Sequence, residues 1–243
     1  MIVIPTAPWL HYVFDLAAWA TAALGARWVF RYRKAAVERL ARQTAPSYFL
    51  ALAIGAGFGA WAFGSVNSLR FAHPTLSHSI AGALAGGIVA VEVWKWRAGV
   101  RSSTGGAFVI PLCLGIMVGR IGCLFAGIAD DTYGVATTLP WGVDLGDGIA
   151  RHPVEIYESL AMAAFLGCYW RALSNGSSWA VKHGFHAFVL AYAVQRFCWE
   201  FFKPYPPLIG PLNLFHLLMI GLAAYAITWI ARTHADAGAI IAA

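Results

Sequence analysis

The amino-acid sequence predicts an all-α integral membrane protein with about seven transmembrane helices. Of its 243 residues, 60% are hydrophobic and 12% are charged, and the mean hydropathy is +0.65. A soluble domain usually carries about 25% charged residues, so much of the usual polar surface is missing. The apolar residues fall in blocks of roughly twenty, the length needed to cross a hydrocarbon core of ~30 Å. These features indicate a single membrane domain over residues 1–243.

The apolar blocks place the helices near residues 9–30, 46–66, 78–97, 105–122, 153–171, 183–203 and 210–231. The first block follows MIVIPTAPWL, which lacks the positive start of a signal peptide, so a retained helix is expected there. The second and third blocks carry the segments GAGFG and GALAG. Small residues let transmembrane helices approach closely, so these two helices are expected to pack through their glycines, which are Gly55, Gly57, Gly59, Gly82 and Gly86.

The distribution of Lys and Arg predicts which side of the membrane each loop faces. The run RYRKAAVERLAR, expected to be a solvated loop, is the densest basic segment, and basic residues collect on the cytoplasmic side. When loops alternate sides, twelve basic residues share the side of this run and Arg70, Arg151 and Lys203 take the other. This predicts an N-terminus outside and a cytoplasmic C-terminus, and the net charge of +6 then requires no nucleic-acid partner. The twelve are Arg27, Arg31, Arg33, Lys34, Arg39, Arg42, Lys95, Arg97, Arg101, Arg171, Lys182 and Arg232.

The longest connection, residues 123–152, is expected on the outer face. Connections of this length without their own helices are usually functional or disordered. This one contains PWGVDLG, which is typical of short β-like or irregular structure with aromatic anchors, so an ordered loop is expected. It also holds four carboxylates, Asp130, Asp131, Asp144 and Asp147.

Charged residues within the apolar blocks are the first functional candidates. A charge at the centre of a membrane helix costs about 2.5–3.5 kcal/mol on insertion scales, so it indicates a function or a buried partner. Arg120 ends the fourth block, flanked by Gly119, Gly122 and Gly127, which leave room for a backbone or a lipid headgroup. In the sixth block Arg196, Glu200 and Lys203 have spacings that place them on one helix face. This stripe is either part of a binding site or an ion pair that fixes helix packing.

The segment RHPVEIYES adds further polar groups at the outer end of the fifth block. Pro153 suits the first turn of a helix, which leaves His152 near the cap. The helix dipole favours Glu155 and Glu158 in the first turns, and capping is an alternative role for His152. Arginine presents fork-like donors to phosphate oxygens, and a histidine beside carboxylates can move a proton. The combined set therefore favours chemistry on a phospholipid, with Arg151, Tyr157 and Glu158 expected near Arg120.

At these residues the sequence resembles the prolipoprotein diacylglyceryl transferase family. The matching segments are Gly119-Arg120-Ile121-Gly122, then Gly127, Tyr133-Gly134 and RHPVEIYES, then Arg196, Glu200 and Lys203 at the spacing of a family pattern. Enzymes of this family move diacylglycerol from phosphatidylglycerol to the thiol of a lipobox cysteine, at the outer face of the bacterial inner membrane. The seven-helix topology with an outside N-terminus is also similar.

The resemblance implies a role for each of these residues. Arg120 and Arg196 would hold the phosphate and stabilise the leaving glycerol phosphate, and Glu200 would orient Arg196. His152, or His78, could deprotonate the incoming thiol, while Tyr157 and Glu158 would position the loop over the site. Gly119, Gly122, Gly127, Arg151 and Lys203 would contribute to substrate binding. The implied partners are phosphatidylglycerol, a lipobox-bearing preprotein or another thiol acceptor, and the membrane.

The sequence also departs from the family pattern. Cys123 and Ala126 stand where the family has asparagines, and Ala81 stands where it has a histidine, with His78 one turn earlier. His11 and Tyr12 correspond to an aromatic pair of the family. The chain therefore resembles a divergent member with its own donor or acceptor. A non-catalytic lipid-binding or scaffold relative is the alternative, whereas an anion transporter would be expected to show broken helices or an inverted repeat.

The remaining cysteines and histidines predict no cofactor and no metal site. Cys113, Cys123, Cys168 and Cys198 are scattered without metal-type spacing. They are expected to be packing residues, with the exception of Cys123, which stands at a position where the family has asparagine. His183 and His186 are expected to be solvated at the membrane interface.

Overall fold

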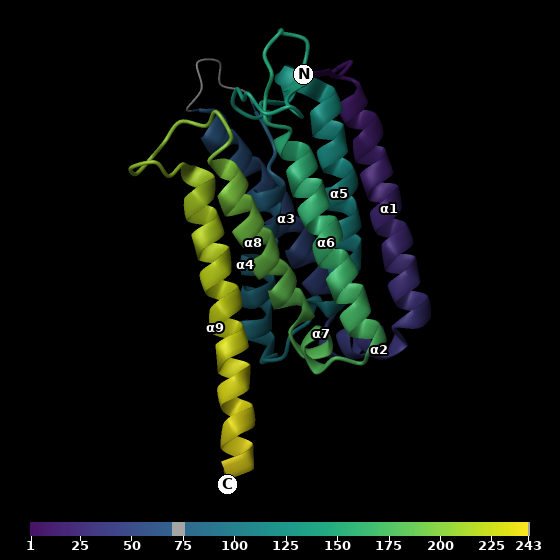
Figure 1. The fold of residues 1–243 in the computed structure, drawn as a ribbon. Coiled ribbons are helices and arrows are strands. Elements are labelled where there is room, and N and C mark those ends of the chain that lie inside the picture. The colour runs from purple at the N-terminus through teal and green to yellow at the C-terminus, as the bar shows by residue number, and fades with distance from the viewer. Residues whose placement is uncertain (70–75, 243) are drawn as a thin grey trace.

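The computed structural model describes residues 1–69 and 76–242, with side chains up to Arg232, as a bundle of helices (Figure 1). A helix lies on each of the seven apolar blocks, with bounds that differ from expectation by a few residues except at the C-terminal end of the last, which continues to Ala242 instead of ending near residue 231. In the described residues the α-helices are α1 Leu10–Tyr32, α2 Lys34–Gln43, α3 Pro46–Ser68, α4 Ile80–Ala98, α5 Val109–Ala126, α6 Val154–Ser174, α7 Ser178–Lys182, α8 Gly184–Glu200 and α9 Leu214–Ala242.

Three helical stretches of the described chain are long and apolar enough to cross a membrane. They are Pro46–Ser68, Gly105–Asp130 and Leu214–Arg232, with hydropathies of 1.7, 2.1 and 1.9. Many large apolar side chains lie exposed on the bundle, among them Leu16, Trp19 and Trp96. An apolar exterior of this size is typical of a protein that faces lipid rather than water.

The basic run between the first two blocks was wrongly expected to be a loop. Lys34–Gln43 forms helix α2, in which Leu40 is buried while the charged side chains are exposed. Apolar residues on one face and charges on the other are typical of a helix that packs along one side only. The sixth block also ends earlier than expected, at Glu200, because Pro204, Pro206 and Pro207 follow closely and cannot continue a helix.

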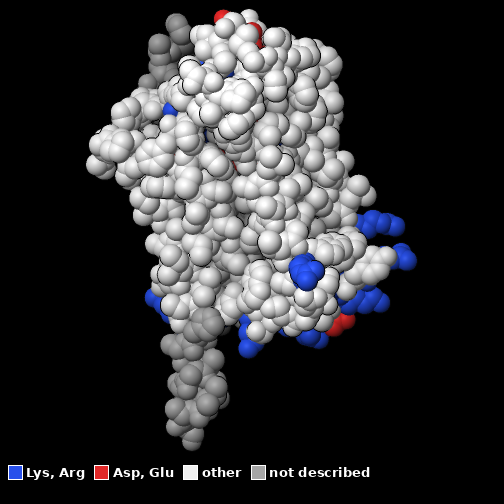
Figure 2. Space-filling view, in the orientation of Figure 1, with Lys and Arg blue, Asp and Glu red and all other residues white. Residues whose placement is uncertain are grey.

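The two ends of the bundle differ in charge. Helices α2 and α7 and the C-terminus lie at one end (Figure 1), and the helix ends and connections that carry the twelve basic residues lie there. Blue Lys and Arg side chains gather at this end in Figure 2, while the middle of this face is almost entirely white. Arg151 and Lys203 lie in connections at the opposite end, and Arg70 lies outside the described residues.

The connection at that opposite end is structured. Its first residues, 123–126, are the last turn of α5, followed by a 3-10 helix at Gly127–Asp130. Strand β2, Val143–Asp144, pairs in parallel with β1, Ile2–Val3. The carboxylate of Asp144 accepts hydrogen bonds from the backbone N–H groups of Gly146 and Gly148, at 2.8 and 3.0 Å. The N-terminal segment is therefore fixed to the loop beside the end of α5.

Helices α3 and α4 pack through four of the five glycines that the sequence singled out. A Cβ added at Gly59 would overlap the carbonyl oxygen of Gly82, and one at Gly86 would overlap that of Gly55. Gly57 is different, because it is exposed and a Cβ there would meet no atom within 4 Å. The prediction for Gly57 was therefore wrong: one face of α3, not the whole segment, needs glycine.

We expect Gly59→Ala to lower the free energy of unfolding by about 1–3 kcal/mol, the usual cost of overpacking a tight interface. The added methyl group must push α3 away from α4, because the atom it meets belongs to the backbone. Thermal unfolding in detergent micelles measures the effect, with Gly57→Ala as the matched control. Equal stability of the two variants would contradict this account of the interface.

Candidate active site

The carboxylate of Glu158 lies at the centre of a buried cluster of cations. Its Oε2 is 2.6 Å from Nε of Arg120 on α5, and its Oε1 contacts Nη1 of Arg196 on α8 and Nζ of Lys203, the latter at 2.8 Å. Glu158 lies on α6, so the contacts join three helices and the turn after α8. All four side chains are buried. A buried charge is costly without a partner, and here each charge has one.

A second carboxylate completes this cluster. Glu200 lies one helical turn after Arg196, and its Oε1 is 2.6 Å from Nη2 of Arg196. Its other oxygen accepts a hydrogen bond from Nδ2 of Asn213, at 3.1 Å. Asn213 also caps α9, because its Oδ1 accepts from the N–H of His216. The cluster of Arg120, Arg196, Lys203, Glu158 and Glu200 thus holds three positive and two negative charges.

Both arginines of this cluster line a cavity of about 800 Å³ at the end of the bundle that holds the N-terminus. Glu158, Glu200 and Lys203 are not in its lining. The two arginines therefore face the cavity, with the carboxylates and Lys203 behind them. Nε of Arg196 makes no hydrogen bond to any described residue. The cavity lining also contains Asp15, Asp130 and Asp131. At the wall formed by the two arginines, the guanidinium groups and the one excess positive charge of the cluster behind them suit a singly charged anion.

A group of different chemistry lies on the same wall, beside Arg120. His11 of α1, Cys123 of α5 and Asp130 of the 3-10 helix have side-chain donor atoms that all lie within 4.8 Å of one another. Nδ1 of His11 is 3.1 Å from Oδ1 of Asp130, and Nη1 of Arg120 is 3.8 Å from Sγ of Cys123. Imidazole, thiolate and carboxylate are together a suitable ligand set for a divalent transition metal. The linear spacing of these residues contains no sign of this group.

The structure brings together most of the residues proposed from sequence. Arg120, Arg196, Glu158, Glu200 and Lys203 contact one another. Lys203 does so from the turn after α8 rather than from a helical stripe. Glu158 contacts the arginines directly, whereas the sequence suggested that it positions the loop.

The predicted glycines and His78 also lie at this cavity or beside it. Gly119 and His78 line it. Gly122 packs against Phe14 of α1, where a Cβ would lie 2.5 Å from that of Phe14. Gly127 has a positive φ of 72° and packs against Thr6. These contacts hold α1 and the N-terminal segment against α5, and so place His11 beside Cys123.

Three of the predicted site residues lie away from the cavity: Arg151 and His152 in the outer connection, and Tyr157 in the first turn of α6. His152 packs against Phe202 with ring centroids 4.7 Å apart, and its Nδ1 is 3.4 Å from the hydroxyl of Tyr157. Arg151 pairs with Asp147 at 2.6 Å, and the guanidinium holds the pKa of that exposed carboxyl below its usual range. None of the three is in the lining of the cavity. Their contacts stabilise the loop next to the site.

Neither the role of Asn213 nor the grouping of Asp130 with His11 was expected from the sequence. Asn213 had a local signal, because it lies near the start of the last apolar block, and asparagine is a favoured N-cap residue. Asp130 was noted as one of four loop carboxylates, and nothing in its neighbourhood distinguishes it from Asp131.

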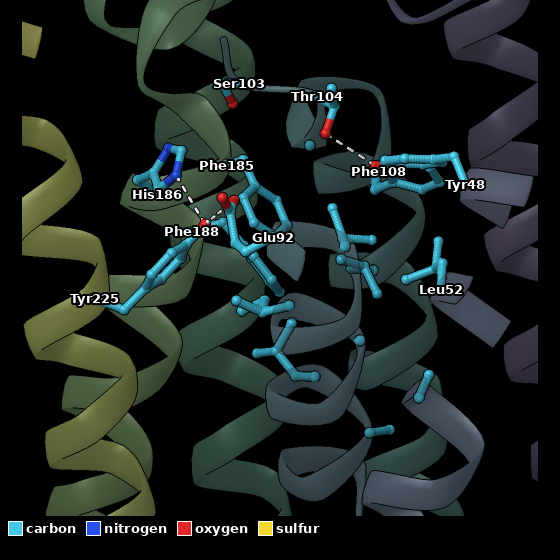
Figure 3. A pocket seen from close by; sticks show the side chains of 18 of the residues that line it. Tyr48, Leu52, Glu92, Ser103, Thr104, Phe108, Phe185, His186, Phe188 and Tyr225 are labelled. Carbon is cyan, nitrogen blue, oxygen red and sulfur yellow. Dashed lines mark hydrogen bonds between the residues drawn. The ribbon is translucent and has the colours of Figure 1, made fainter. Parts of the chain in front are cut away.

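A smaller cavity, of about 280 Å³, lies between α3, α4, α5, α8 and α9. Figure 3 shows Tyr225 turned toward Glu92 and His186, with its hydroxyl 2.9 Å from Oε1 of Glu92 and 3.3 Å from Nε2 of His186. His186 also stacks on Trp229. The expectation that His183 and His186 are solvated was wrong, because both are buried. Most polar groups of the lining contact one another, since Lys95 pairs with Glu92 and the hydroxyls of Tyr48 and Thr104 are 3.0 Å apart, and most of the remaining lining is apolar.

Comparison with known proteins gives consistent matches. A sequence model of the prolipoprotein diacylglyceryl transferase family matches residues 71–232. A phosphatidylglycerol–prolipoprotein diacylglyceryl transferase of Coxiella burnetii is 31% identical over 167 residues, 63% of this chain and 62% of the relative. The enzyme of the same name from Solidesulfovibrio magneticus is 31% identical over 170 residues, with the same coverage.

The matched segment covers part of the relatives only. The chain spans about 62% of the length of these curated relatives. No solved structure matches the chain.

Proposed function

Because the chain belongs to the prolipoprotein diacylglyceryl transferase family, we propose that it transfers a diacylglyceryl group from phosphatidylglycerol to a cysteine thiol. The acceptor is a lipobox-bearing preprotein or another thiol acceptor at the outer face of a bacterial inner membrane. The relatives named above support the reaction, since their names give the same donor and acceptor.

The observation that carries this proposal is the charge of the cluster that faces the cavity. Three cations against two carboxylates leave one positive charge, and both arginines line the cavity wall. The phosphodiester of phosphatidylglycerol carries one negative charge, so its binding would neutralise the cluster. Guanidinium groups that contact a phosphate also stabilise the charge that develops as it leaves.

In the proposed reaction, a carbon–sulfur bond replaces a carbon–oxygen bond of the lipid. The thiolate sulfur attacks the glyceryl carbon that carries the phosphate oxygen, and a carbon–sulfur bond forms as the carbon–oxygen bond breaks. The electron pair stays on glycerol phosphate, which leaves against Arg120 and Arg196, and a base accepts the thiol proton. We assign that role to His78 rather than to His152, because His78 lines the cavity. Glu200 positions Arg196, which it contacts.

We also propose that the chain is one membrane domain with seven crossings, the N-terminus outside and the C-terminus cytoplasmic. The basic end of the bundle would then face the cytoplasm and the cavity the outer face. The anionic cytoplasmic leaflet attracts basic segments, and α2 presents such a segment at that end.

A lipid-binding relative without transfer activity is the second candidate. It is favoured by Cys123 and Ala81, at positions where the family pattern has asparagine and histidine. Measuring the release of glycerol phosphate distinguishes the two candidates, because both would bind phosphatidylglycerol but only the enzyme would release glycerol phosphate.

We expect the purified full chain, in micelles that contain phosphatidylglycerol, to release glycerol phosphate and to add a diacylglyceryl mass to the cysteine of a lipobox peptide. Both products should appear in equal amounts, because one reaction forms them. A peptide with the cysteine replaced by serine is the control. If neither product forms while an active family member assayed in parallel forms both, the result would favour the non-catalytic candidate.

A further inference from the structure

The cavity wall also contains a histidine, a cysteine and an aspartate, three residue types that commonly bind metal ions. They lie outside the cluster of arginines and glutamates described above. They come from three elements that the fold brings together: His11 from the start of α1, Cys123 from the last turn of α5 and Asp130 from the 3-10 helix that follows. All three line the 800 Å³ cavity. The cysteine is buried, and the other two are partly buried.

The spacing of these atoms suits a zinc ion. Zn²⁺ binds N, S and O donors at about 2.0–2.3 Å, so the donors of a tetrahedral site lie ~3.3–3.8 Å apart. Each of the three side chains has one donor atom, and these atoms all lie within 4.8 Å of one another. Nδ1 of His11 is 3.1 Å from Oδ1 of Asp130. Small side-chain rotations therefore give the required geometry.

The other ring nitrogen of His11 has the partner that a metal-binding histidine usually has. Its Nε2 is 3.3 Å from Oδ2 of Asp15, one helical turn further along α1. Histidine ligands almost always donate their second ring N–H to a carboxylate, a carbonyl or water, which fixes the ring and the tautomer. Asp15 would hold His11 with Nδ1 directed at the site.

We propose that His11, Cys123 and Asp130 bind Zn²⁺ as three protein ligands and leave the fourth position open to the cavity. Cys123 as a thiolate and Asp130 as a carboxylate supply two negative charges, which balance the ion. Three protein ligands with an open fourth position are typical of catalytic rather than structural zinc. The exposure of the group to a cavity, instead of a closed core, agrees with this class.

This step rests on the proposed function: the open coordination position of the zinc ion would bind the thiol of the acceptor cysteine. A thiol that coordinates a metal ion loses its proton, and His78 on the same wall would accept it. The bound thiolate would lie next to Arg120, whose Nη1 is 3.8 Å from Cys123. It would then attack the glyceryl carbon while glycerol phosphate leaves against the arginines. The thioether product is a weaker ligand than the thiolate, which favours its release.

Cobalt binding to the full-length protein tests the site directly. Zn²⁺ is d¹⁰ and gives no spectrum, so Co²⁺ is added to purified protein after treatment with a chelator. We expect a single equivalent to bind, with a thiolate-to-cobalt absorption band that Cys123→Ser abolishes. The exposed Cys168 provides the matched control, and Cys168→Ser should retain the full band. We also expect Asp15→Asn to weaken metal affinity about 10–100-fold.

The outcomes separate this inference from the proposed function. Absence of the band in a wild-type protein that transfers lipid, or an unchanged band in Cys123→Ser, would overturn the metal site and leave the proposed function intact. The band together with its change on addition of a lipobox peptide would support the role in thiol binding. Metal binding without any transfer would overturn the proposed function instead. Thermal unfolding of Cys123→Ser checks that the variant is folded.

Discussion

Arg120→Ala is expected to lower the rate of glycerol phosphate release about 10²- to 10³-fold, and Arg196→Ala should have an effect of the same size. Removal of one preorganised donor that contacts developing charge typically costs this much. Both guanidinium groups line the cavity and are held in place by Glu158. The variants should still fold, because Glu158 keeps two of its three cationic partners in each.

Two further variants show whether the guanidinium group itself is needed. Arg120→Lys keeps the charge but loses the planar fork of donors, so we expect activity between wild type and Arg120→Ala. Arg42→Ala removes an exposed arginine of α2 at the other end of the bundle and should leave transfer unchanged. Full activity in Arg120→Ala would exclude its assignment to the phosphate.

Glu158→Gln is expected to lower the free energy of unfolding by about 3–5 kcal/mol, the usual loss when one partner of a buried ion pair is removed. Glutamine keeps the shape of the side chain but leaves Arg120, Arg196 and Lys203 with Glu200 as the remaining carboxylate of the cluster. Urea or thermal unfolding in detergent measures the loss.

Glu155 on the same helix provides the matched control. It is also buried, but the hydrogen bond that its Oε1 accepts from the hydroxyl of Thr132 is long, at 3.4 Å, and joins it to a neutral group. Glu155→Gln should therefore cost much less than Glu158→Gln. Equal losses in the two variants would mean that the cluster around Glu158 contributes little beyond the burial of a carboxyl group.

The positions of the helices followed from local properties of the sequence. Length and apolarity predict a helix in each of the seven blocks, because a segment in lipid must satisfy its own backbone hydrogen bonds. Prolines then fixed the ends, as between α8 and α9. The short helix α2 did not follow from the same properties, because its high charge is typical of a loop, although Leu40 and its apolar neighbours give it a buried face.

The sequence also identified part of the site, for a physical reason that does not depend on the fold. A charged side chain in an apolar block is costly wherever it lies, so Arg120, Arg196 and Glu200 stood out. The spacing of Arg196 and Glu200 even predicted their contact, because residues four apart are neighbours on a helix. Glu158 did not stand out in this way, because it lies near the start of its helix, where the dipole alone accounts for an acidic residue.

By itself, therefore, the sequence determined the helices, the distribution of basic residues and the presence of unusual charges within apolar segments. The tertiary structure decided which charges meet. Glu158 contacts Arg196 across 38 positions of the chain, and His11 meets Cys123 and Asp130 from the far end of the sequence. Such contacts depend on how each helix is rotated about its axis and where it crosses its neighbours. Close contacts such as those of Gly59 and Gly122 set that arrangement, and no local spacing encodes it.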